Sequence, residues 1–236
     1  MTALISLKSG YGAWGAPFVK FTLTYDGSLP ASGNGSSKSR TKWEIRKKLH
    51  PQLKDLWTTH PALRDIELNG RYWPQRGGGF VIQTHHEHPG PVIRPETLKV
   101  PDQGVIDLCE PIEKHGAWFR PLVRDSFALH CGLQVLFLRK EHPGKVYQGG
   151  DIDGRIKTLL DALAMPQHAE QVLEKDTTRF EPLYCLLQDD SAVSGLKIET
   201  DRLLADSVSP KDYVRLIIEV DVRVRQAMHY NQSFLG

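Results

Sequence analysis

The sequence predicts a single α/β domain, and two patterns of apolar residues carry that prediction. Residues 126–139 and 213–224 alternate apolar and polar side chains with the two-residue period of a strand. Residues 149–163, GGDIDGRIKTLLDAL, place apolar side chains at 156, 159, 160 and 163, the spacing of one helix face. Strands and helices that alternate along a chain are typical of α/β proteins, in which helices cover a sheet.

The first expected elements are a strand and a helix joined by a flexible loop. Residues 18–25, FVKFTLTY, place an apolar side chain at every second position from Val19 to Tyr25, as a half-buried strand does. The stretch DGSLPASGNGSSKSR is rich in Gly, Ser and Pro and is expected to be a loop. Residues 41–57 have a helical apolar stripe, and Pro51 predicts a kink or a break near His50.

Basic side chains gather at the start of this helix. Between positions 38 and 48 the sequence has only one acid, Glu44. A solvated helix face explains the cluster as well as a phosphate-contacting patch does, although counterion release rewards such clusters on nucleic acid. The candidate nucleic-acid-binding residues are Lys38, Arg40, Lys42, Arg46, Lys47 and Lys48.

Residues 61–124 show no clear period and are interpreted as an insertion, with one short strand expected at 80–85. A cluster of histidines follows that strand, but adjacent histidines on a strand point to opposite faces, so an exposed loop is preferred to a zinc site. Three nearby residues with basic or aromatic side chains could stack on or contact nucleic acid, but residues of a surface hairpin would look the same, and the hairpin interpretation is preferred. The histidine cluster is His85, His86, Glu87 and His88, and the three other residues are Arg71, Trp73 and Arg76.

The strand expected at 126–139 places its apolar residues on one face and His130 on the other, where a hydrogen-bonded sheet histidine is expected rather than a catalytic base. Asp151 and Asp153 therefore fall in a strand-to-helix connection, a common place for sites in α/β proteins. Asp153 is expected to cap the helix. Lys157, one turn later, either leans back over the carboxylates or pairs with Asp161 at i, i+4.

A second acidic pair, Asp189 and Asp190, lies in QDDSAV. Each acidic pair alone is usually structural, but several carboxylates at element ends form an all-oxygen set of ligands for a hard divalent cation. Such an ion activates water for attack on a phosphodiester, and a nearby lysine stabilises charge on the phosphate.

The two motifs, DIDGRIKTLLDAL and QDDSAV, resemble those of the RusA-type Holliday-junction resolvases. The resemblance implies that Asp151, Asp153 and Asp190 bind metal, that Lys157 is catalytic, and that Asp189 assists. Gly154 stands where the family has asparagine. The spacing between the acidic pairs is longer than in the family, which indicates a lengthened loop at about 165–181, including a short helix candidate.

The remaining chain completes one RusA-like domain over residues 1–236, a mixed sheet with helices that carries the insertion at 61–124. Residues 193–200 are expected to form a strand. Residues 213–224 place valine, leucine and isoleucine on one face and charged residues on the other, as in a one-sided sheet.

Composition excludes several classes of protein. The net charge is only +2, so nucleic-acid binding must come from local patches. No apolar run approaches a membrane span, and the first residues do not resemble a secretory signal. Three widely spaced cysteines, Cys109, Cys131 and Cys185, fit a reducing compartment with buried thiols, so a cytoplasmic protein is expected.

The functional prediction is a Mg²⁺-dependent endonuclease, with Mn²⁺ as a substitute, that cleaves branched DNA such as a Holliday junction in recombination or repair. The resemblance also implies a homodimer, whose two-fold symmetry suits a two-fold junction. Two alternatives stay open: a nucleic-acid-binding module with a degenerate acidic site, for which Gly154 is the motive, and a nuclease of the same chemistry that acts on other branched, single-stranded or phage DNA.

Overall fold

The main sheet has four strands in the order β1-β11-β8-β10. The computed structural model describes residues 19–30, 35–69, 71–74, 80–82, 91–92, 106–140, 151–204, 212–225, 231 and 234. The strands are β1 (Val19–Ser28), β8 (Leu129–Arg139), β10 (Val193–Arg202) and β11 (Tyr213–Val224). Strand β11 pairs antiparallel with both β1 and β8, whereas β10 pairs parallel with β8, so the sheet is mixed, as predicted.

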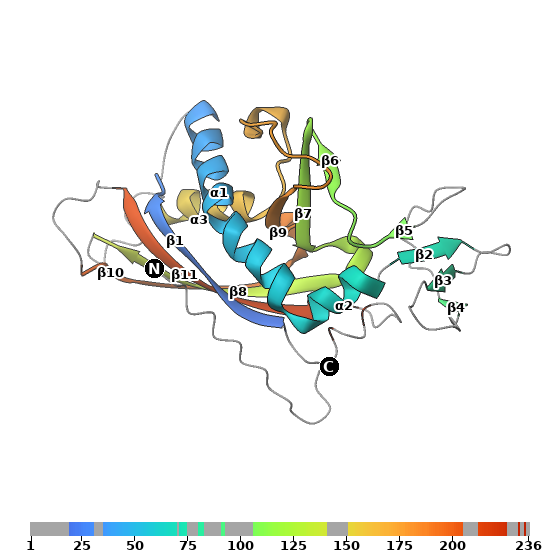
Figure 1. The fold of residues 1–236 in the computed structure, drawn as a ribbon. Coiled ribbons are helices and arrows are strands. Elements are labelled where there is room, and N and C mark those ends of the chain that lie inside the picture. The colour runs from blue at the N-terminus through green and yellow to red at the C-terminus, as the bar shows by residue number, and fades with distance from the viewer. Residues whose placement is uncertain are drawn as a thin grey trace, which may run out of the picture.

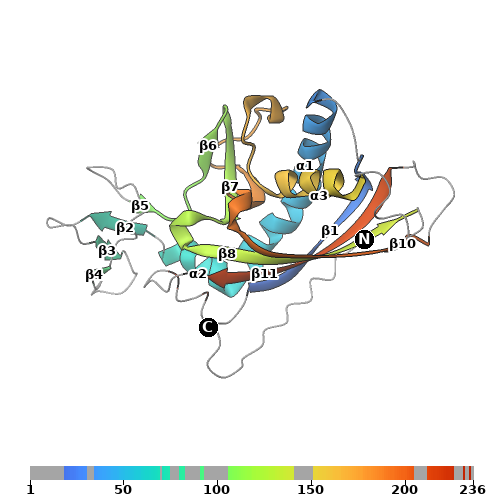
Figure 2. The ribbon, with the colours of Figure 1, turned by 180° about the vertical axis from the view of Figure 1, so that it is seen from behind.

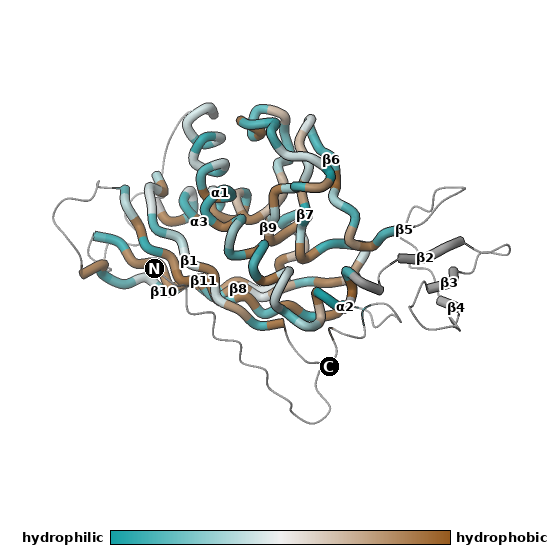
Figure 3. Tube along the Cα trace, viewed as in Figure 1, coloured by the Kyte–Doolittle hydropathy of each residue, from teal (hydrophilic) through white to brown (hydrophobic). Residues whose placement is uncertain are grey.

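One face of this sheet carries the hydrophobic core. In β11 the side chains from Val214 to Val222 are buried at every second position, and β8 shows the same alternation from Leu129 to Phe137. Helices α1 and α3 lie on this face (Figures 1 and 2). Figure 3 shows hydrophobic residues along much of β8 and of β9 (Leu183–Leu187), a strand outside the main sheet. The predicted one-sided sheet is confirmed for β8 and β11.

Helix α1 (Gly35–Thr59) is continuous, so of the kink or break expected near His50 the break is wrong. Pro51 lies inside the helix and is exposed, and a proline there removes one backbone hydrogen bond. The buried residues Leu49, Leu53 and Leu56 lie on one face before and after it. Their burial against the sheet keeps both halves in one helix, and α2 (Pro61–Asn69) follows directly.

A second, three-stranded sheet was not predicted. It consists of β6 (Ile112–Lys114), β7 (Ala117–Val123) and β9, with β7 and β9 parallel. The β6–β7 hairpin turns at His115 and Gly116, which both have positive φ (56° and 81°), as a type I′ turn requires. Part of the stretch interpreted as an insertion therefore belongs to the core, because Phe119 in β7 is fully buried.

The remaining described elements are short. A small sheet contains β2 (Arg71–Pro74), β3 (Phe80–Ile82), β4 (Pro91–Val92) and β5 (Ile106–Asp107). The strand expected at 80–85 is confirmed over Phe80–Ile82, and the rest of it lies outside the described residues. The 3₁₀ turns whose bounds are described are η1 (Asp125–Phe127), η3 (Ala169–Gln171) and η4 (Asp190–Ala192). The short helix expected within 165–181 is η3.

Candidate active site

Helix α3 (Asp151–Leu163) carries the first acidic motif. Its buried stripe includes Ile156, Leu159 and Leu163, and its solvent face exposes Asp153 and Lys157. The helix begins at Asp151, so Asp153 lies in the first turn and is not the cap that the sequence predicted. Negative charge in the first turn is favoured by the helix dipole. The chain thus keeps a carboxylate and an amine on one exposed face.

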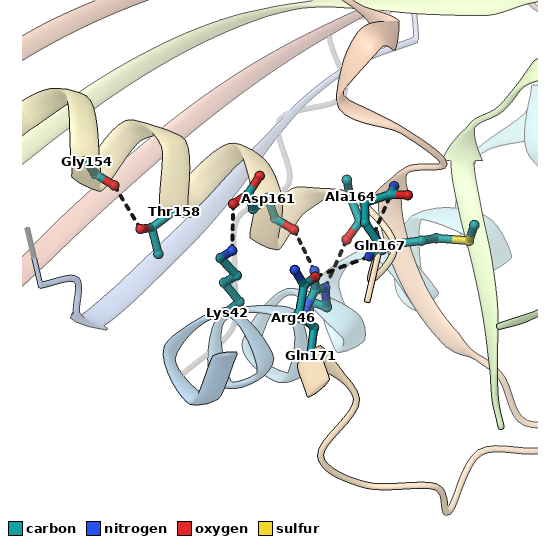
Figure 4. Close-up of polar contacts among 9 residues, drawn as sticks. Lys42, Arg46, Gly154, Thr158, Asp161, Ala164, Gln167 and Gln171 are labelled. Atoms are coloured by element: carbon teal, nitrogen blue, oxygen red, sulfur yellow. Dashed lines mark hydrogen bonds and ion pairs between the residues drawn. The ribbon is translucent and has the colours of Figure 1, made fainter. Parts of the chain in front are cut away.

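The alternative role for Lys157, an i, i+4 pair with Asp161, is wrong. The carboxylate of Asp161 instead forms an ion pair with Lys42 of α1, whose Nζ lies 2.6 Å from Oδ2 (Figure 4). Within the described residues no hydrogen bond or ion pair involves the side chain of Asp153 or of Lys157. Both groups are therefore available to a ligand.

The second acidic motif divides into a structural and an exposed carboxylate. Asp189 precedes η4, and its Oδ1 accepts the backbone N–H of Ser191 at 3.0 Å. Its Oδ2 accepts Nε2 of Gln167 at 3.1 Å. Hydrogen bonding from Ser191 lowers the pKa of Asp189 below its ordinary value. Asp190 is the more exposed of the two carboxylates.

The two acidic motifs approach each other through η4, which contacts α3. Asp189, however, is held by Gln167 beyond the carboxyl end of α3, whereas Asp153 lies in the first turn. Among the described side chains, which include Asp153, Asp189 and Asp190, no three acidic, histidine or cysteine groups lie close enough to hold a metal ion. The side chain of Asp151 lies outside the described residues, so the expected ligand set is described only in part.

The basic run on α1 contains one residue that is buried rather than exposed. Arg46 is only 1% exposed, and burial lowers the pKa of its guanidinium to about 10. Its Nε donates to the carbonyl of Ala164 at 2.9 Å and its Nη2 to the carbonyl of Asp161 at 2.6 Å (Figure 4). These carbonyls belong to the last turn of α3 and the residue after it, where backbone acceptors lack helical partners. Arg46 therefore fixes the end of α3 to α1.

The other basic residues differ in how far they are available to a nucleic acid. Lys47 Nζ donates to Glu174 Oε1 at 2.9 Å. Lys48 donates to the carbonyl of Asp26 and lies 5.2 Å from the centre of the Tyr25 ring. Arg40 is exposed, and no described residue hydrogen-bonds or ion-pairs with it. The exposed charge of the run is thus smaller than the sequence suggests.

A pocket of about 300 Å³ adjoins the acidic turn, and the sequence did not indicate it. Asp125, His130, Gln188, Asp189, Ser194 and Arg225 are among the residues that line it. His130 Nδ1 lies 2.7 Å from Ser194 Oγ, which supports its interpretation as a hydrogen-bonded sheet histidine. These residues come from segments far apart in sequence, so no local pattern marks the pocket.

The three cysteines are free and buried, as expected. Burial raises the pKa of each thiol to about 12, which leaves them protonated and unreactive at neutral pH.

Several other predicted residues lie outside the described part of the structure. They are the histidine cluster (His85, His86, Glu87 and His88), Arg76, and the side chains of Arg71 and Trp73.

No family model matches this chain, and no curated protein and no solved structure matches it either. In the part of the chain that the structure describes, no helix is both long and apolar enough to cross a membrane.

Proposed function

We propose that this chain is a Mg²⁺-dependent DNA endonuclease of the RusA type, with branched DNA as its substrate class. The observation that carries the proposal is the exposed face of α3, where Asp153 and Lys157 have no described partner. Their polar neighbours serve the fold instead: Thr158 Oγ1 donates to the carbonyl of Gly154 at 2.8 Å, and Asp161 binds Lys42. Unpartnered opposite charges on one face suit a ligand that carries both a cation and a phosphate.

The chemistry of the donor set, rather than its described geometry, suits the proposed metal. Asp151, Asp153 and Asp190 offer only carboxylate oxygens, the ligands that Mg²⁺ prefers, and Mn²⁺ accepts the same ligands. When bound there, the ion supplies a water of lowered pKa and neutralises phosphate charge. Lys157 donates hydrogen bonds to the non-bridging oxygens of the phosphate, where negative charge grows as the water attacks. Asp189 acts by holding η4, and hence Asp190, in place.

The test is a cleavage panel with Mg²⁺, with Mn²⁺ and with EDTA, on a four-way junction, a flap, duplex, single-stranded DNA and RNA. We expect Mg²⁺-dependent nicking of branched DNA. Asp153→Asn should lower the cleavage rate by at least about a hundredfold while DNA binding and melting persist. The matched control is Asp55→Asn, an exposed carboxylate on α1, which should cleave like the wild type.

Two outcomes would select another function. If Asp153→Asn cleaves DNA at the wild-type rate, the carboxylate of Asp153 has no role in catalysis. DNA binding that survives EDTA, with no cleavage of any substrate, would favour a binding module with a degenerate site. That second candidate is favoured by the absence of a three-ligand group among the described side chains and by Gly154. Cleavage of another substrate in the panel, but not of the four-way junction, would favour a nuclease of the same chemistry that acts on other DNA.

A further inference from the structure

Gln167 has a hydrogen-bond partner at each of its four polar groups. Its side-chain Oε1 accepts Nζ of Lys114 at 2.9 Å, and its Nε2 donates to Oδ2 of Asp189 at 3.1 Å. Its backbone N–H donates to Oε1 of Gln171 at 3.2 Å (Figure 4). Its carbonyl accepts Nε2 of His115 at 3.1 Å, because a carbonyl oxygen can only accept. Gln167 therefore joins the tip of the β6–β7 hairpin, η3 and the acidic turn.

The charges on either side fix the orientation of the Gln167 amide. The ammonium of Lys114 can only donate a hydrogen bond, and the ionised carboxylate of Asp189 can only accept one. A flipped amide would point its N–H groups at the ammonium and its oxygen at the carboxylate, so both bonds would be lost. Hydrogen bonds to charged groups are also stronger than those between neutral groups. The series Lys114–Gln167–Asp189, called the relay below, is thus held in one arrangement.

The relay ends on the residue that caps η4. Both carboxylate oxygens of Asp189 are engaged inside the protein, Oδ1 by the N–H of Ser191 at 3.0 Å and Oδ2 by Gln167. Asp190 is the first residue of η4 and follows Asp189 directly. A cap that is held at two points fixes the backbone of the turn, whereas the side chain of Asp190 is exposed. The relay therefore bears on the direction in which Asp190 presents its carboxylate.

We propose that Lys114 and Gln167 are positioning residues, which fix the acidic turn and hence the carboxylate of Asp190. Lys114 lies in the stretch interpreted as an insertion, and Gln167 lies in the lengthened loop. These two segments thus build a support for the second acidic motif, to which neither is adjacent in sequence. The effect on cleavage rests on the proposed function, whereas the support of the turn does not.

The first test measures the turn in the full chain without DNA or metal. Exchange of the Ser191 N–H with water, followed by NMR, reports its bond to Asp189. Gln167→Met, a side chain of similar length without the amide, should speed this exchange by about tenfold. Lys114→Met should speed it by about threefold, because the Gln167 amide then loses the charge that orients it. Lys114→Arg keeps a positively charged donor and should exchange like the wild type.

Matched controls separate this effect from a general loss of stability. Lys175 lies over the same hairpin, with its side chain beside Gly116, but it has no described bond to Gln167. Lys175→Met and the exposed β8 variant Gln134→Met should both leave the Ser191 exchange unchanged. The amides of β11 should stay protected in every variant. Unchanged Ser191 exchange in Lys114→Met would overturn the relay, whether or not Gln167→Met folds.

The second test measures cleavage under single-turnover conditions. Lys114→Met should lower the maximal rate by about tenfold, because misplaced groups at a reacting centre slow the reaction. Its dissociation constant for DNA should stay within about twofold of the wild type, because the relay acts on Asp190 and not on DNA. Weaker DNA binding with a wild-type maximal rate, or faster Ser191 exchange with unchanged cleavage, would overturn the positioning role. A wild type that cleaves nothing would refute the nuclease, and the exchange of Ser191 would still decide the relay.

Discussion

For Lys157 the structure excludes one of the two roles that the sequence suggested, the ion pair with Asp161. Its helical position predicted exposure, and the structure confirms it. The partner of Asp161 was not predictable, because Lys42 lies far away in sequence and meets α3 only when the two helices pack. With its i, i+4 pair excluded, Lys157 contributes little to helix stability. The catalytic role proposed for Lys157 is therefore compatible with a side chain that the described fold does not use.

We therefore expect Lys157→Ala to bind DNA and to melt like the wild type but to cleave about a hundredfold more slowly or worse. Single-turnover cleavage with saturating Mg²⁺ measures the effect without interference from product release. A rate within about threefold of the wild type, equivalent to about 0.65 kcal/mol in barrier, would return Lys157 to a neutral surface position.

Substitutions at Asp189 and at Asp190 should affect different properties, the first the stability of the fold and the second the rate of cleavage. Asp189→Ala removes the cap of η4 and should lower the free energy of unfolding by about 1 kcal/mol at neutral pH. Because the folded pKa of Asp189 is lowered, its charged form stabilises the fold above the ordinary value of 3.8. That contribution is lost as the pH falls through the lower folded pKa.

The measurement is denaturant unfolding at neutral pH and again below pH 3.8, where the difference between Asp189→Ala and the wild type should shrink. Asp190→Ala is the matched control, because this neighbour is exposed and has no described capping role. It should leave stability nearly unchanged and abolish cleavage. A stability loss in Asp190→Ala as large as that in Asp189→Ala would contradict the division of roles.

At the scale of the element, α1 combines two functions that sequence composition cannot distinguish. The basic run counts six positive charges, yet Arg46 is an internal clamp on α3. A guanidinium becomes a clamp only through carbonyls supplied by a distant helix, and no local spacing reveals them. Lys38 and Arg40, at the start of the helix, are the members of the run with no described ion pair or hydrogen bond.

Replacement of Lys38 and Arg40 by alanine should therefore weaken DNA binding and reduce its salt dependence. Each lost phosphate contact should decrease the slope of log K against log salt by roughly 0.9 on duplex DNA. Arg46→Met is the contrasting variant. It should lower the free energy of unfolding by at least about 2 kcal/mol, because it leaves two carbonyls at the end of α3 unpaired. An unchanged slope after replacement of Lys38 and Arg40 would indicate that the basic run is a solvated helix face that does not contact phosphates.

Strands were predictable where one face meets solvent and not where both are covered. Strand β11 alternates buried and exposed residues along nearly its whole length, so the sequence predicted its bounds correctly. All five residues of β9 are buried, and an unbroken apolar run has no period to recognise. The β6–β7 hairpin turns at His–Gly, not at the Asn–Gly or Asp–Gly that usually marks such a turn.

At the scale of the whole molecule, the predicted α/β class and the one-sided main sheet are confirmed. The interpretation of residues 61–124 as an insertion missed that β7 joins β9 inside the structure. The proposed metal-binding residues were predictable only as a set of residue types, because their arrangement in space depends on how η4 and α3 meet. The fold therefore supplies the exposed face of α3, and the motif supplies the chemistry proposed for it.

The pairing of β1 with β11 has a consequence for how the chain reaches its native state on the ribosome. Val19 lies opposite Val222, so the contact joins residues from nearly opposite ends of the sequence. Strand β11 also lies between β1 and β8, which means that the sheet cannot assemble until this late segment has been synthesised. Until then β1 and β8 expose apolar faces and unpaired edges, the features that invite aggregation. Such long-range pairing is also intrinsically slow. We therefore expect a chain that lacks β11 to aggregate more readily than the full chain.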